Sequence, residues 1–260
     1  MSNLLKAQFY RLFHGKFYFV IILINVFINI FGVAAYWMLE NDPTTGREGV
    51  QSVKGYTLMY KVISSGGVEV FEIVAIIFVA LFIASGFRQG NIKSEISFGY
   101  KRVSIYLSKL LSSMVGVVGI VASSMLTGLV AGTAFFGFGS PVGNDVIIGL
   151  IRAFILVMLV SLAFCSIYVL ISFVLKEPGA IIGIYIGFTV LITNLLVAQL
   201  SQRFEWFKKA MDYIPQTQFY NVASIDINAA TAHTAVAYTI VLMFASTLVG
   251  CAIFRKQDIT

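Results

Sequence analysis

Few residues whose side chains could take part in catalysis or polar binding lie inside the apolar parts of this chain. Glu72 falls within an apolar run, where an ionisable side chain is costly and is a functional candidate by default. Two other interpretations stay open, a carboxylate at the level of the lipid headgroups and one paired with Arg152. Asn25 and Asn29, one helical turn apart in another apolar run, are expected to bond to neighbouring helices rather than to a substrate.

Motifs for catalysis and nucleotide binding are missing from the sequence. It contains no GxxxxGK[ST] loop, the signature of a nucleotide-binding P-loop. His14 and His233 are the only histidines and are predicted on opposite sides of a membrane, which excludes a Ser–His pair or an HExxH zinc site within it. We therefore expect no enzyme activity, no metal and no cofactor on this chain. A net charge of +6 is weak support for a nucleic-acid partner, and none is expected.

The elements that must position these residues are membrane-spanning helices. Of the 260 residues, 58% are hydrophobic and 12% are charged, whereas soluble domains carry about 25% charged residues. Apolar runs of about 20 residues recur, and each is long enough to cross a bilayer as a helix. We predict an all-α integral membrane protein with a single transmembrane domain over 1–260. Its six predicted spans are residues 17–37, 70–87, 110–136, 146–175, 180–200 and 234–254.

Residues 2–16 are predicted to form an amphipathic helix that lies in the membrane interface. Leu5, Phe9, Leu12 and Phe13 share one face, at the i, i+4, i+7, i+8 spacing of an apolar helical stripe. Polar residues take the other face, namely Asn3, Arg11 and His14.

A short polar helix is predicted between the second and third spans. Asn91 is a suitable N-cap, and Ile92 and Ile96 lie one turn apart with Glu95 beside them. Gly99 is a natural terminator of this helix, and a new helix can start at Ser104. A polar helix joined to the membrane at both ends is typical of a docking element for a partner in the water phase.

Lys and Arg predict the orientation of the chain. They are in excess over acidic residues in residues 1–16, residues 88–109 and the tail that begins at Arg255. Such an excess marks the cytoplasmic side of a membrane. We expect a multi-pass protein of the cell membrane with both termini and the polar helix in the cytoplasm.

Three glycines give the fifth predicted span one small-residue face. Gly179, Gly183 and Gly187 follow GxxxGxxxG spacing, which allows another helix backbone to approach closely. The neighbour is either a helix of another membrane subunit or a helix of the same subunit.

These features resemble the ABC-2 type permeases, the membrane subunits of bacterial ABC transporters whose ATPase is a separate polypeptide. The similar features are the N-terminal interfacial helix, the six spans and the polar helix between spans two and three. Two motifs add to the resemblance: Glu95…Gly99-x-x-Arg102-x-x-Ile105-x-x-x-Lys109, and the ending Phe254-Arg255-Lys256-Gln257-Asp258-Ile259. In size and style the chain is similar to permeases of lantibiotic immunity and bacitracin resistance systems.

The resemblance implies a role for each of three regions. The polar helix would be a coupling helix that docks on the ATPase and offers it the Glu95 carboxylate; its residues are Asn91, Ile92, Lys93, Ser94, Glu95, Ile96, Ser97 and Phe98. The second and fifth spans would line the substrate route, with Glu72, Tyr185, Phe188, Thr193 and Asn194. The glycine face would contact a second permease, identical or homologous. Two cytosolic ATPase subunits would bind the ATP and Mg.

The expected function is export of a hydrophobic or amphiphilic substrate, such as an antimicrobial peptide, a drug or a lipid-like molecule. A stand-alone secondary carrier or channel is an alternative, for which Glu72 is the one deep carboxylate. A membrane scaffold or sensor that transports nothing is another.

Overall fold

The computed structural model describes residues 2–41, 54–59, 68–139, 143–187, 206, 215–223 and 227–257. Over these residues the chain is helical and contains no strand. Five helices are long and apolar enough to cross a membrane: Lys16–Glu40, Phe71–Arg88, Arg102–Phe136, Asn144–Leu175 and Ala229–Lys256. The all-helical class is confirmed, and the five helices support a protein embedded in a membrane.

These five helices coincide with five of the six predicted spans. The remaining one, 180–200, corresponds to α8 (Pro178–Gly187) over its first part, and residues 188–200 lie outside the described residues. Lys176, in the left-handed conformation with φ 59°, ends the preceding helix and makes the tight turn into α8.

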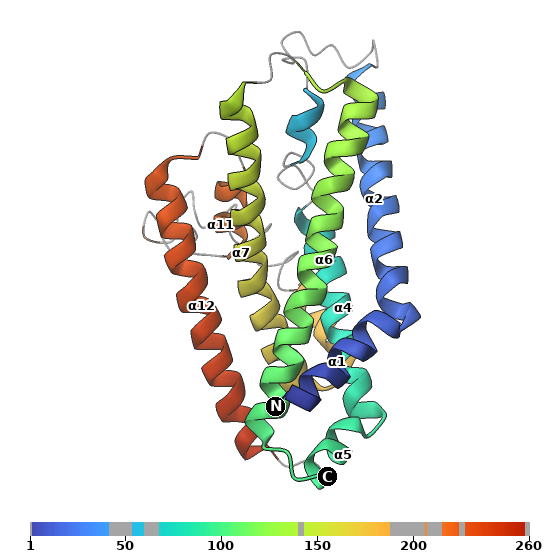
Figure 1. Ribbon diagram of the computed structural model, residues 1–260, viewed down its shortest axis with the longest axis vertical. Coiled ribbons are helices and arrows are strands. Elements are labelled where there is room, and N and C mark those ends of the chain that lie inside the picture. The colour runs from blue at the N-terminus through green and yellow to red at the C-terminus, as the bar shows by residue number, and fades with distance from the viewer. Residues whose placement is uncertain are drawn as a thin grey trace.

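Two long helices form the middle of the bundle (Figure 1). These are α6 (Arg102–Phe136) and α7 (Asn144–Leu175). On either side of them, α2 (Lys16–Glu40) packs along α6 and α12 (Ala229–Lys256) packs along α7. The fifth long helix, α4 (Val68–Arg88), contacts both central helices.

The outer helices expose apolar side chains, while α4 buries them. On α2, Phe27 and Phe31 are exposed, as are Val241 and Leu248 on α12. Exposed apolar surface of this extent marks a contact with lipid or with another protein. Glu72 lies on α4, so its carboxylate belongs to the protein interior rather than to the lipid-facing surface.

Three elements gather at one end of the bundle (Figure 1). They are α1 (Ser2–His14), α5 (Asn91–Ser97) and the last turn of α12. There, the Arg102 guanidinium joins the start of α6 to the end of α12. Its Nη1 donates to the carbonyls of Phe254 at 3.4 Å, Arg255 at 3.3 Å and Gln257. The two motifs that carry the family resemblance, far apart in the sequence, therefore meet in space.

A short segment at the opposite end of α6 fills a groove made by glycines. It is the 3₁₀ turn η1 (Gly55–Thr57), followed by Leu58 and Met59. The Gly55 amide donates to the Gly137 carbonyl at 2.9 Å. A Cβ at Gly132 would lie 2.5 Å from the Gly55 oxygen, and one at Gly128 would lie 2.9 Å from the Leu58 oxygen. Only glycine at these α6 positions allows so close an approach.

Candidate functional site

The polar helix predicted between the second and third spans exists as α5. It begins at Asn91, one residue earlier than an Asn91 N-cap predicts, because Gly90 takes the N-cap position with φ 70°. Asn91 is therefore not the N-cap. Its side-chain amide instead donates to Gln89 Oε1 at 3.1 Å. Glycine reaches this positive φ without a steric penalty, which sets the sharp change of direction between α4 and α5.

Gly99 ends α5 as the sequence predicts. With φ 82°, it lets its own amide donate to the Ile96 carbonyl at 2.9 Å and the Tyr100 amide to Glu95 at 3.3 Å. This pair of bonds is the Schellman motif, which satisfies the last carbonyls of a helix. The next helix, α6, starts at Arg102, two residues before the predicted Ser104.

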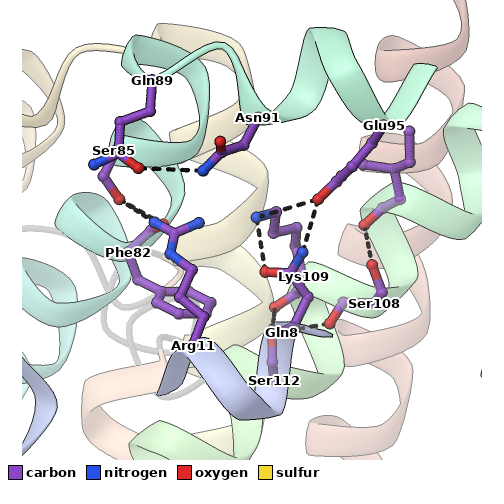
Figure 2. A network of polar contacts seen from close by, with 11 residues as sticks. Gln8, Arg11, Phe82, Ser85, Gln89, Asn91, Glu95, Ser108, Lys109 and Ser112 are labelled. Carbon is purple, nitrogen blue, oxygen red and sulfur yellow. Dashed lines mark hydrogen bonds and ion pairs between the residues drawn. The ribbon is translucent and has the colours of Figure 1, made fainter. Parts of the chain in front are cut away.

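The inner face of α5 is held by a buried polar network (Figure 2). Gln8 Nε2 on α1 donates to Glu95 Oε1 at 2.8 Å. Lys109 Nζ on α6 donates to Gln8 Oε1 at 2.8 Å and lies 4.0 Å from Glu95 Oε1. Beside them Ile92 is wholly buried. Charged and amide groups thus join α1, α5 and α6. Because these groups are removed from water, leaving any of them without a partner would be costly.

Arg11 adds a second contact from α1, this time to α4. Its Nη2 donates to the Phe82 carbonyl at 3.0 Å and to Ser85 Oγ, while its guanidinium carbon lies 5.0 Å from the centroid of the Phe82 ring. Burial lowers the pKa of Arg11, and the nearby Glu95 carboxylate opposes that shift. The guanidinium remains charged, since arginine is not deprotonated in proteins.

The predicted faces of the N-terminal helix need a correction. Arg11, expected on the polar face, turns toward α4, while Phe13 is exposed, as an apolar side chain that faces lipid would be. The buried stripe is Leu4, Gln8 and Leu12. The stripe shifted because Gln8 and Arg11 find polar partners inside the protein, which offsets the cost of burying them.

The outer face of α5 is free of such contacts with the rest of the described chain. Four of the eight predicted coupling residues are exposed there: Lys93, Ser94, Ser97 and Phe98. Phe98 is 83% exposed, a high value for a phenylalanine next to a fully ordered turn. Glu95, in contrast, is only 16% exposed at its side chain and is engaged with Gln8 and Lys109. The exposed surface is therefore made by Lys93, Ser94, Ser97 and Phe98, and excludes Glu95 and Ile96.

Two residues of the predicted substrate route meet in the interior. The Tyr185 hydroxyl on α8 donates to Glu72 Oε2 on α4, and the Glu72 side chain is wholly buried. The ring of Tyr168 on α7 packs edge-on against Tyr185, with centroids 5.6 Å apart. The other three predicted route residues lie outside the described residues: Phe188, Thr193 and Asn194.

The glycine face of α8 is open within the described chain. Gly179 and Gly183 are exposed and Gly187 is half-buried. A Cβ placed at any of the three would meet no described atom within 4 Å. Nothing described in this subunit therefore occupies the face.

Asn25 and Asn29 serve the packing of α2 against α6. Asn25 Nδ2 donates to the Ile120 carbonyl at 3.1 Å and to Ser124 Oγ at 2.7 Å, and Asn29 Nδ2 donates to the Asn25 carbonyl at 2.7 Å. Both amides are buried. The interpretation as packing groups is confirmed.

Gln8 was not among the residues expected from the sequence, and Lys109 was expected only as the last residue of a motif. Gln8 follows Leu4 by four residues and precedes Leu12 by four, so its place in a buried stripe was the available signal. Lys109 directly precedes the apolar run of the third predicted span. The part of the chain that the structure describes holds no group of three or more His, Cys, Asp or Glu able to bind a metal ion.

The sequence from Tyr18 to the end matches one family model. That model is described as "Protein of unknown function (DUF2705)" and covers residues 18–260. The chain belongs to the DUF2705 family. The match includes α5, Lys109 and Glu72, and it begins after α1, so Gln8 and Arg11 lie before the first matched residue. No curated protein matches the chain.

Proposed function

We propose that this DUF2705 protein is the membrane subunit of an ATP-driven ABC transporter, with α5 as the helix that docks on a separate ATPase. The observation that carries the proposal is the two-sided character of α5. Its inner face is tied to α1 and α6 by Gln8, Glu95 and Lys109, and its outer face presents Phe98 to the surroundings. A rigidly held, exposed aromatic side chain is what a binding hot spot requires.

The proposal includes the membrane arrangement of the resembling permeases. It has six spans, α1 in the membrane interface and both termini in the cytoplasm of the cell. Two ATPase subunits bind the ATP and Mg, and a second permease, identical or homologous, completes the membrane unit. The gathering of α1, α5 and the end of α12 at one end of the bundle supports this arrangement (Figure 1).

The proposed substrate is a hydrophobic or amphiphilic molecule that is exported, such as an antimicrobial peptide, a drug or a lipid-like compound. The buried pair Glu72–Tyr185 supports a route through the interior near α4 and α8. A carboxylate in the interior of a membrane protein is costly and is retained where it has a task.

The test is binding of the cognate ATPase to the full-length protein. Affinity purification of the chain from its own membranes is expected to recover an ABC ATPase, identified by mass spectrometry. Phe98→Ala should weaken this association about tenfold or more, as expected for loss of an aromatic hot spot. Tyr10→Ala removes another exposed aromatic at the same end of the molecule (65% exposed) and serves as the matched control.

The outcomes separate the proposal from its alternatives. Recovery of no ATPase, or equal effects of the two substitutions, would exclude α5 as the docking helix. A stand-alone carrier, which the buried Glu72 also favours, would instead be shown by transport in vesicles that contain only the purified chain and an ion gradient. A scaffold or sensor would show neither transport nor stimulated ATPase activity.

A further inference from the structure

A cavity of about 350 Å³ lies where α1 turns into α2 beside α4. One wall is polar, with Arg11, Ser85 and Gln89, and the other is apolar, with Phe17, Phe78 and Leu81. The volume falls in the range of small-molecule sites, and an apolar lining with a few polar groups is typical of them. The residues given to the coupling face and to the substrate route do not line this cavity.

Buried positive charge exceeds negative charge behind the polar wall. A point at the Cβ position of Gly86 would lie 3.3 Å from Lys109 Nζ and 3.5 Å from Arg11 Nη1, so the two cations flank the same glycine. One carboxylate, Glu95, is close to them, at 4.0 Å from Lys109. Arg11 Nη1 is buried and has no hydrogen-bond partner within the described chain, while Arg11 as a residue contributes to the lining of the cavity. An anion in the cavity would offset the excess positive charge of Arg11 and Lys109, because charges in a poorly solvated site interact strongly.

The location of the cavity indicates where such an anion comes from. The cavity includes Gly15 and Phe17, on both sides of Lys16, where the first long apolar helix begins. Lipid headgroups lie at the ends of membrane-spanning helices, and acyl chains lie along their apolar parts. Phe17 is 39% exposed beside the buried Phe78 ring, so the apolar wall continues onto the lipid-facing surface.

We propose that this cavity binds one anionic phospholipid of the surrounding bilayer, with its phosphate facing Arg11 and the start of an acyl chain against Phe17, Phe78 and Leu81. Gln89 supplies an uncharged amide donor beside the phosphate, while the Ser85 hydroxyl donates to the Phe82 carbonyl and accepts from Arg11. The bound lipid joins the turn between α1 and α2 to α4, and so stabilises the end of the bundle that carries α5. The proposal is independent of transport and of any ATPase.

The test counts lipids retained by the full-length protein. The protein is stripped in detergent and incubated with phosphatidylglycerol or with phosphatidylcholine of the same acyl chains, and bound lipids are counted by native mass spectrometry. We expect one phosphatidylglycerol to be retained in preference to phosphatidylcholine. Arg11→Gln keeps donors for Phe82 and Ser85 but removes the charge, and should weaken this retention about tenfold, as for loss of a charge-assisted hydrogen bond.

Two further variants separate this site from general attraction to basic protein. Arg88→Gln removes an exposed charge at the end of α4 that does not line the cavity and should leave retention unchanged. Leu81→Trp fills the apolar wall while Arg11 remains, and should lower retention even if Arg11→Gln fails to fold. An equal loss with Arg11→Gln and Arg88→Gln would overturn the proposal, as would unchanged retention with Leu81→Trp. Binding of soluble glycerol 3-phosphate as tightly as phosphatidylglycerol would also overturn it, since the acyl chain would then contribute nothing and the occupant would be a free anion.

Discussion

The ammonium group of Lys109 donates a hydrogen bond of 2.8 Å to the side-chain oxygen of Gln8, and both side chains are buried, at 0% and 3% exposed. The amide nitrogen of Gln8 in turn donates a hydrogen bond to the Glu95 carboxylate. A single amide therefore links α6 and α5 to the N-terminal helix. A displacement of α5 would change the environment of a charge on α6, so the exposed face of α5 and a long central helix are physically linked.

The network predicts that Lys109→Met destabilises the protein more than a surface lysine does. The substitution removes a donor to Gln8 and the cation near Glu95. Leaving buried polar groups without partners costs about 1–3 kcal/mol, so the free energy of unfolding in detergent should fall by that amount. Lys93→Met, on the exposed face of α5, is the control, with an expected change within about 0.5 kcal/mol.

A double-mutant cycle identifies the cause of that loss. Glu95→Gln in the Lys109→Met background should cost less than it does alone, because the carboxylate has then already lost its cation. Equal melting of Lys109→Met and Lys93→Met would mean that the network contributes nothing to stability.

The glycine groove of α6 predicts a second difference between matched variants. Gly132→Ala would place a methyl group 2.5 Å from the Gly55 oxygen and 2.8 Å from Leu58 Cβ, so η1 must move away. We expect faster proteolysis between Gly55 and Met59 and a loss of stability of about 1–3 kcal/mol. Gly32→Ala, which meets nothing within 4 Å on α2, should be neutral or stabilising by up to about 1 kcal/mol. Similar proteolysis of the two variants would contradict this close contact.

The bond between Tyr185 and Glu72 predicts coupled effects of their substitution. Tyr185→Phe removes a hydroxyl donor from a buried carboxylate and should lower the free energy of unfolding by about 1–3 kcal/mol. In the Glu72→Gln background the same change should cost less, since a neutral amide loses less than a charge does. Tyr10→Phe, at an exposed site, is the control. Strict additivity of the two substitutions would show that the bond is not formed in the membrane protein.

Local signals in the sequence predicted the existence and the end of α5, although its N-cap is Gly90 rather than Asn91. Gly99 ends that helix in the left-handed conformation, and Ile92 faces inward as its spacing from Ile96 indicates. Such features depend on the residue itself and its immediate neighbours. The long apolar helices were predicted from equally local signals, because length and hydrophobicity alone make them candidates for membrane spans.

Contacts between distant segments were not predictable in the same way. The faces of α1 were assigned by polarity, and Arg11 was placed on the wrong one because its partners, Phe82 and Ser85, lie on another helix. Glu95 was expected to face a partner for the same reason, as neither Gln8 nor Lys109 is near it in sequence. Small residues at GxxxG spacing, such as Gly128 and Gly132 of α6, allow a close approach of some backbone, but their spacing does not indicate that Gly55 supplies it.

The open glycine face of α8 predicts a contact with another membrane subunit. Gly183→Leu adds a branched side chain where the described chain offers no contact within 4 Å, so the isolated subunit should fold normally. If a second permease packs there, the close approach is blocked, and crosslinking of the membrane-embedded pair should fall several-fold. Ile184→Phe enlarges an exposed residue about 100° around the helix and should leave crosslinking unchanged. Intact assembly of Gly183→Leu would place the dimer contact elsewhere, and the exposed apolar side chains of α12, such as Leu248, would then be the next surface to test.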